Sequence, residues 1–280
     1  MSQAGQFPEA SILNKFLLKG KNIVITGGSR GLGFNFAYTL AQVGANIAVI
    51  DLSEHPSEDM AKLEPFGGKY RYYQADVVDY QLLKNTVDRI HADFGSIDGW
   101  QGPPLSLLCS ALLLCIPAAG IIRDKPFLEH TEKDFRDTMD VNVNGVFFTV
   151  QHCTAKMAQQ GTGGTVVCIA STAGHKSLAP QEIAAYTASK YAVRGIAKHV
   201  AHELAKYGIR VNSISPGTVQ TDMLESVMRQ NPSRRKLFLE SNALGRLAAP
   251  DELSGMVLYL MSEASSYTTG QDFLVDGGMV

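Results

Sequence analysis

The sequence is poor in cysteine and nearly balanced in charge. Its 280 residues include four cysteines, Cys109, Cys115, Cys153 and Cys168, and no two of them have CxxC spacing. We therefore expect no disulfide framework and no metal site, and interpret the four as buried or idle thiols in a reducing compartment. The formal net charge of −2 gives no reason to expect a nucleic-acid partner.

Long apolar runs are missing as well. The run over residues 105–116 is too short to span a bilayer and contains two serines. Residues 1–20 lack a basic segment followed by an apolar core and a cleavage site, so no secretory signal is expected. The basic cluster at 234–236 is short and is typical of a solvated helix face. These features predict a cytoplasmic protein with no membrane partner.

Strand-like and helix-like segments alternate along the chain. Short apolar runs predict strands over 22–26, 46–51, 165–170, 209–214 and 272–275, with another ending at 75–76. Helical spacing covers 31–43, 80–94, 131–159, 184–207 and 251–261. This alternation predicts an α/β fold, a doubly wound parallel sheet with helices on both faces. We expect an N-terminal extension over 1–19 and a single domain over 20–280.

A glycine-rich turn, Thr-Gly-Gly-Ser-Arg-Gly-Leu-Gly over 26–33, joins the first expected strand to the first helix. A pyrophosphate needs backbone N–H groups at close range in front of a helix N-terminus, and side chains would block that approach. Gly27, Gly31 and Gly33 leave it open. Glycine turns also join strands to helices for steric reasons alone. Its position after a strand nevertheless favours a dinucleotide site.

Two charged residues near this turn bear on the choice of coenzyme. Asp51 ends the second expected strand, where a carboxylate accepts hydrogen bonds from the ribose hydroxyls of NAD and repels a 2′-phosphate. An aspartate that caps a helix or forms a turn would look the same. Arg30 favours the phosphate of NADP instead. We expect NAD(H), with NADP(H) as the alternative.

A serine, a tyrosine and a lysine form the second constellation. Tyr186 and Lys190 lie one turn apart on an expected helix, and Ser171 follows the fifth strand. A neighbouring ammonium is expected to lower the pKa of the phenol, which then exchanges a proton with a carbonyl oxygen. Ser171 is expected to donate a hydrogen bond to that oxygen. The Tyr-x-x-x-Lys pattern alone is also found in ordinary amphipathic helices.

Together these residues resemble the short-chain dehydrogenase/reductase family from about Leu18 to Gly278. The resemblance is carried by motifs at 26–33, 75–77, 141–145, 170–174, 186–190, 210–212, 215–217 and 275–278. It implies a Rossmann-type fold, a homotetramer, and catalysis by Asn142, Ser171, Tyr186 and Lys190, in which Asn142 holds a water molecule that links Lys190 to solvent. It implies coenzyme contacts at Thr26, Gly27, Ser29, Arg30, Gly31, Leu32, Gly33, Asp51, Asp76, Val77, Ala119, Gly120, Tyr186, Lys190, Pro216, Gly217, Val219 and Thr221.

The chain departs from the family pattern in two places. The turn after the fourth expected strand reads Pro-Ala-Ala-Gly over 117–120, so alanine replaces the asparagine of the family's Asn-Ala-Gly turn. About fifteen surplus residues, roughly 99–113, precede the glycine at 120. They form either a surface loop or partner contact, or a sequence artefact such as unspliced coding sequence.

The loops around the expected site bear on the substrate. Residues 174–175, 180–181 and 265–270 are similar to loops of the fungal ketose reductase and polyol dehydrogenase branch. This resemblance implies a sugar alcohol/ketose substrate, contacted by Ser171, Tyr186, His175 and Gln181, beneath a lid over 221–247. The methionines of that lid favour a 3-oxoacyl or other apolar ketone instead. A dinucleotide-binding sensor or scaffold without turnover is the alternative outside enzyme classes.

Overall fold

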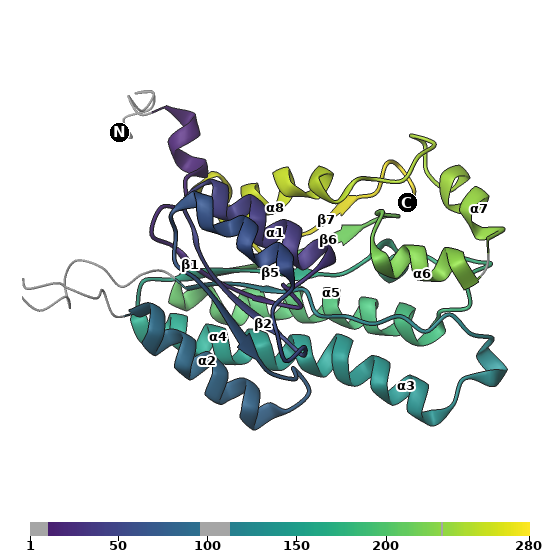
Figure 1. Ribbon diagram of the computed structural model, residues 1–280, viewed down its shortest axis with the longest axis horizontal. Coiled ribbons are helices and arrows are strands. Elements are labelled where there is room, and N and C mark those ends of the chain that lie inside the picture. Colours follow the sequence, from purple (N-terminus) through teal and green to yellow (C-terminus); the bar gives the residue numbers. More distant parts are fainter. Residues whose placement is uncertain (1–10, 96–112, 231) are drawn as a thin grey trace, which may run out of the picture.

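The computed structural model describes residues 11–95, 113–230 and 232–280. Seven parallel strands form one sheet in the order β3-β2-β1-β4-β5-β6-β7 (Figure 1). The order reverses between β1 and β4, so the connections after these two strands run to opposite faces of the sheet and leave a crevice at the strands' carboxyl ends. The strands are β1 (Asn22–Thr26), β2 (Asn46–Asp51), β3 (Tyr70–Gln74), β4 (Leu113–Pro117), β5 (Gly164–Ile169), β6 (Ile209–Pro216) and β7 (Asp272–Val275).

Helices cover both faces of the sheet, as the alternation predicts. α1 and α8 pack on one face, and α2, α4 and α5 pack on the other (Figure 1). Each face has its own apolar core, so β1, β4 and β5 are buried along their whole length. The helices are α1 (Gly31–Gln42), α2 (Tyr80–Gly95), α3 (Glu132–Met139), α4 (Gly145–Gln160), α5 (Ala184–Leu204), α6 (Asp222–Gln230), α7 (Arg234–Glu240) and α8 (Ser254–Met261).

The helix expected over 131–159 is interrupted. α3 begins behind a capping box made by Thr131 and Asp134 and ends at Met139. A π-helical turn, Asp140–Asn144, follows, and α4 begins at Gly145. A Cβ on Gly145 would lie 2.7 Å from a methyl carbon of Val77, so glycine lets this helix approach the segment after β3. The widened turn places Asn142 in the interior, 0% exposed.

Several sequence expectations fall wholly or partly outside the described residues. The surplus segment at 99–113 is described only at Leu113, which begins β4. Of the extension at 1–19, residues 11–19 are described, and Ile12–Phe16 form a 3-10 turn. Of the segment at 221–247, residue 231 is not described. No helix among the described parts of the chain has the length and apolar character needed to cross a membrane.

Candidate active site

A cavity of about 960 Å³ opens at the carboxyl ends of the central strands. Its wall collects segments far apart in sequence: the glycine turn, the ends of β2, β4, β5 and β6, and parts of α5, α6 and α7. Most of the site residues expected from the sequence are in this wall. They are Gly27, Arg30, Gly31, Leu32, Gly33, Asp51, Asp76, Val77, Ala119, Gly120, Ser171, Gln181, Tyr186, Lys190, Pro216, Gly217, Val219 and Thr221.

The glycine turn has the shape that a phosphate-binding turn requires. A Cβ on Gly33 would lie 2.1 Å from the carbonyl oxygen of Gly27, and a Cβ on Gly27 would lie 2.7 Å from Cα of Ala119. Gly31, with φ of +57°, has no protein atom near its Cβ direction, because the cavity lies there. α1 begins at Gly31, so the first N–H groups of the helix are available to an anion. These residues fit the pyrophosphate of a nicotinamide dinucleotide.

Thr26 and Ser29 lie outside the cavity wall and brace the turn. The Ser57 amide donates to Ser29 Oγ at 3.2 Å, and the Ala119 amide donates to Thr26 Oγ1 at 3.4 Å. The Ser29 amide in turn donates to Asp51 Oδ2 at 3.0 Å. Thr26 therefore positions Ala119, and Ser29 positions Asp51, both of which line the cavity.

Asp51 lies at the end of β2 with its carboxylate at the cavity. Its Oδ1 accepts a hydrogen bond from the Leu52 amide at 2.8 Å, in addition to the Ser29 contact. Arg30 lines the same cavity and is exposed. Across the described ranges no ion pair joins Arg30, or any other cation, to this carboxylate. The negative charge at this end of the cavity is held by backbone amides alone.

Ser171, Tyr186 and Lys190 come together at the other part of the wall. Tyr186 shares a hydrogen bond with Ser171. Lys190, one turn further along α5, places Nζ 5.4 Å from the centre of the Tyr186 ring and donates to the Ile169 carbonyl at 2.9 Å. Ser171 is 9% and Lys190 5% exposed. The three polar groups therefore meet in a confined space next to the glycine turn.

Burial dominates the electrostatics of this trio. It raises the pKa of Tyr186 above its ordinary value, and the hydrogen bond with Ser171 lowers it by less. It also lowers the pKa of Lys190 to about 8. The expectation that the ammonium lowers the phenol pKa is therefore not met in this structure. Desolvation of the phenolate is the largest effect on the pKa of Tyr186, and the Lys190 amine hydrogen-bonds to a backbone carbonyl.

Asn142 does not line the cavity but fastens one of its walls. Its Oδ1 accepts from the Ile121 amide at 2.8 Å, and its Nδ2 donates to the Ile121 carbonyl at 2.9 Å. Nδ2 also lies 3.0 Å from Ser189 Oγ on α5. The side chain thus ties the loop after β4 to the helix that carries Tyr186 and Lys190. Its role in holding a water stays a prediction.

The two expected sugar ligands have different positions. Gln181 lines the cavity. His175 does not, because its ring faces away and its Nε2 lies 2.6 Å from Asp272 Oδ2 and 3.1 Å from Ser215 Oγ. The structure therefore does not bring His175 to the substrate half of the cavity.

Five charged residues in the cavity wall escaped the sequence reasoning. They are Arg123, Asp124, Lys125, Asp222 and Arg229. The first three follow the Ala-Ala-Gly turn after a central strand. Because ligands bind at the carboxyl ends of such strands, their position in the sequence could have indicated that they line the cavity. Lys125 pairs with Asp134 at 3.1 Å. Arg123 and Arg229 have no ion pair within the described residues.

A model of the family described as short chain dehydrogenase matches residues 21–232. The chain belongs to the short-chain dehydrogenase family. It is 34% identical to the 2-dehydro-3-deoxy-D-gluconate 5-dehydrogenase of Dickeya dadantii over 95% of this chain and 98% of that one. It is 33% identical to the sorbose reductase of Candida albicans, over 99% and 92%.

A solved crystal structure has the same fold. It is a gluconate 5-dehydrogenase from Burkholderia cenocepacia in complex with NADP and tartrate, with a TM-score of 0.84. It is 29% identical, and the match covers 96% of this chain and 98% of that one. This short-chain dehydrogenase is thus an oxidoreductase acting on an alcohol group.

Proposed function

We propose that this short-chain dehydrogenase interconverts a sugar alcohol and the corresponding ketose with a nicotinamide coenzyme. The observation that carries the proposal is the meeting of Ser171, Tyr186 and Lys190 on the wall of the cavity that also contains the glycine turn. A carbon–oxygen group placed between the trio and the turn has a proton donor on one side and coenzyme on the other. The likeness to a sorbose reductase supports the substrate class.

Each polar group has a defined task. A bound nicotinamide would supply the hydride chemistry at the alcohol or ketone carbon. The raised pKa of Tyr186 keeps its phenol protonated at neutral pH, ready to give that proton to the ketone oxygen. Ser171 Oγ accepts from the Ala173 amide at 3.1 Å, so its own hydrogen is left for the substrate oxygen. In the oxidation direction Tyr186 takes the proton back.

Lys190 and Asn142 act behind these two residues. The Lys190 ammonium, fixed on the Ile169 carbonyl, is placed to hydrogen-bond a nicotinamide ribose and to favour the phenolate during turnover. The family pattern gives Asn142 the water that returns protons to Lys190. Its hold on Ile121 keeps the intervening wall in place.

NAD(H) is the favoured coenzyme and NADP(H) the alternative. The Asp51 carboxylate is not neutralised by a described cation, so a 2′-phosphate beside it would be repelled. Arg30 at the same cavity opposes this preference. The NADP bound by the Burkholderia relative supports NADP(H) as the alternative.

A sugar acid is the second candidate substrate. Arg123 and Arg229 line the cavity and lack ion-pair partners in the described parts of the chain, and a guanidinium pairs well with a carboxylate. The Dickeya relative is named for a sugar acid, and the Burkholderia relative holds tartrate. A carboxylated substrate would lose binding when Arg123 becomes methionine, whereas a neutral polyol would not.

Assembly and location complete the proposal. Exposed aromatic side chains on α4 and α5, Phe147 and Tyr191, support burial of this face in a homotetramer. The free, buried thiols of Cys115, Cys153 and Cys168 support a cytoplasmic location.

Replacement of Tyr186 by phenylalanine tests the reaction. Wild type and Tyr186→Phe are compared on polyols, ketoses, sugar acids and a 3-oxoacyl thioester, each with NAD(H) and NADP(H). We expect loss of activity by about 10²- to 10⁴-fold, because the proton donor is removed. Tyr267→Phe, a change at a fully exposed tyrosine outside the cavity wall, is the control. An unchanged rate in Tyr186→Phe would reject Tyr186 as the proton donor, whereas NADH binding by wild type without activity on any of these substrates would favour the sensor or scaffold.

A further inference from the structure

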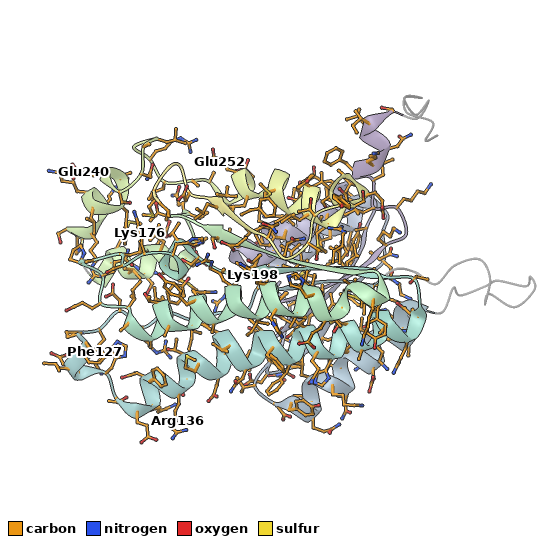
Figure 2. All side chains as sticks on the ribbon, turned by 180° about the vertical axis from the view of Figure 1, so that it is seen from behind. Phe127, Arg136, Lys176, Lys198, Glu240 and Glu252 are labelled. Carbon is orange, nitrogen blue, oxygen red and sulfur yellow. The ribbon has the colours of Figure 1, made fainter. Side chains whose placement is uncertain are left out.

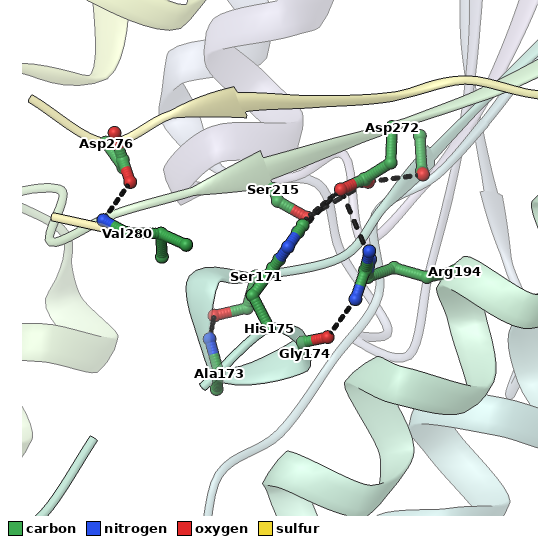
Figure 3. A network of polar contacts seen from close by, with 10 residues as sticks. Ser171, Ala173, Gly174, His175, Arg194, Ser215, Asp272, Asp276 and Val280 are labelled. Atoms are coloured by element: carbon green, nitrogen blue, oxygen red, sulfur yellow. Dashed lines mark hydrogen bonds and ion pairs between the residues drawn. The ribbon is translucent and has the colours of Figure 1, made fainter. Parts of the chain in front are cut away.

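A network of charged and hydroxyl side chains lies behind the turn that carries Ser171 (Figure 3). His175 Nε2 lies 2.6 Å from Asp272 Oδ2, and Arg194 Nε lies 3.2 Å from the same oxygen. The Asp272 side chain is 15% exposed and that of His175 is 14% exposed. Asp272 comes from β7, Arg194 from α5, and His175 from the loop after β5. Three distant segments therefore converge on one carboxylate.

Hydroxyl groups of β6 complete the surroundings of Asp272. Ser213 Oγ donates to Oδ1 at 2.5 Å, and Ser215 Oγ lies 2.9 Å from Oδ2 and 3.1 Å from His175 Nε2. Both carboxylate oxygens thus have partners. Arg194 Nε makes the ion pair but no hydrogen bond, so the hydrogen bonds that hold these segments in one arrangement come from His175 and the two serines.

The turn itself is held at both ends. After Ser171 comes a 3-10 turn, Thr172–Gly174, in which the Gly174 amide donates to the Ser171 carbonyl at 2.8 Å. The Arg194 guanidinium donates to the Gly174 carbonyl, and His175 follows directly (Figure 3). A Cβ on Gly174 would lie 2.9 Å from the carbonyl group of Lys190. The turn is therefore pressed onto α5 at the lysine of the site.

None of the three charged residues reaches a ligand. His175, Arg194 and Asp272 are all absent from the cavity wall, whereas Ser171, Tyr186 and Lys190 are in it. Their effect on the site must therefore pass through the turn. Resting on the proposed function, we propose that Asp272, with His175 and Arg194, is a positioning residue that fixes the hydroxyl of Ser171 relative to Tyr186.

Asp272→Asn tests the proposal, because it keeps the shape and removes the charge that draws in His175 and Arg194. Asp276→Asn is the matched control, since that carboxylate lies nearby and bonds to Val280 rather than to the network (Figure 3), and it also accepts the Gly278 amide. We expect kcat to fall by about 10- to 100-fold in Asp272→Asn, as for a misplaced reacting group. The Kd for NADH and the kcat of Asp276→Asn should stay within about twofold of wild type.

The Ser171→Ala background decides whether the effect passes through the serine. We expect Asp272→Asn to lower kcat there by less than about twofold, because the group that it positions is already gone. An equal fall in both backgrounds would overturn the proposal. If Asp272→Asn does not fold, His175→Gln takes its place. It removes the contact between His175 and Asp272, and its kcat is compared in the wild-type and Ser171→Ala backgrounds.

A readout without turnover separates this proposal from the proposed function. Amide hydrogen exchange over 172–176 should accelerate at least about tenfold in Asp272→Asn and stay unchanged in Asp276→Asn. Unchanged exchange would refute the network as a clamp even in an active enzyme. Accelerated exchange in a protein without dehydrogenase activity would retain the clamp and reject the reaction.

Discussion

At Lys190, burial and charge act against each other. The amine is 5% exposed and its pKa falls to about 8, because an ammonium loses hydration in the interior. The Ile169 carbonyl at 2.9 Å is its hydrogen-bond acceptor. At the scale of single residues, the charged form of Lys190 therefore lowers the stability of the folded protein.

This opposition predicts a pH dependence of stability. Between about pH 8 and the ordinary lysine pKa of 10.5, the unfolded chain binds a proton that the folded protein does not, so the Lys190 contribution to stability rises with pH in that window. The free energy of unfolding of wild type relative to Lys190→Met should therefore increase from pH 7 to pH 10, measured by urea denaturation. The raised pKa of Tyr186 adds no opposing loss until above about pH 10.

Lys198→Met on the same helix is the control for that measurement. Lys198 is exposed and projects from α5 (Figure 2). The difference in free energy of unfolding between wild type and Lys198→Met should not change from pH 7 to pH 10. A flat difference for Lys190→Met as well would mean that Lys190 is solvated and keeps its proton.

At the scale of elements, the helices after β6 are held over the cavity by a buried ion pair. Arg234, which begins α7 and is 8% exposed, pairs with Asp124 in the loop after β4. The Glu182 amide donates to the other carboxylate oxygen of Asp124 at 3.0 Å, and Arg234 Nη2 lies 3.9 Å from Glu182 Oε2. One carboxylate thus joins three segments around the cavity mouth.

Removing one partner of this pair should loosen the segment proposed as a lid over 221–247. Leaving a buried charge unpaired costs about 3–5 kcal/mol, so Arg234→Met should raise the open population by about 100-fold or more. Faster chymotrypsin cleavage within 221–247 would report this, together with a higher KM. Lys236→Met changes an exposed residue on the same helix and should cleave at the wild-type rate. Equal rates for the two variants would show that the pair does not restrain the helices.

At the scale of the whole molecule, the glycine turn after β1 and the trio carried by the β5 end and α5 lie in the wall of one cavity at the carboxyl ends of the strands. Ligand that binds there contacts β1, β2, β4 and β5 segments together. Binding should therefore stabilise the fold as a unit rather than one loop.

Thermal unfolding measures this stabilisation and the coenzyme preference at once. NADH at 100 times its Kd adds about 2.7 kcal/mol, which in a domain of this size raises Tm by about 5–10 °C. The shift with NADPH should be smaller, and Asp51→Asn should reduce the difference. Asp59→Asn, exposed and paired with Lys62 outside the cavity, is the control. An equal or larger shift with NADPH in wild type would contradict the NAD(H) preference.

Local patterns were sufficient for most of the architecture. The apolar runs at 22–26 and 46–51 match β1 and β2 residue for residue, and their order with the helices predicted the parallel sheet. The single helix expected over 131–159 did not include the π turn at Asp140–Asn144, since a π turn widens the helix without any residue that forbids an α-helix there. Residues 96–112 lie outside the description, so the two readings of 99–113 both stand.

The sequence alone determined the glycine turn and the Ser171, Tyr186 and Lys190 set, because strand ends and helical spacing are local and fix which face a residue takes. Only the tertiary structure decided how those groups titrate and which polar residues reach the cavity. His175 turns to Asp272, 97 positions away in the chain, and Arg234 turns to Asp124. Burial and ion pairing depend on neighbours brought together by packing, and no spacing along the chain contains that information.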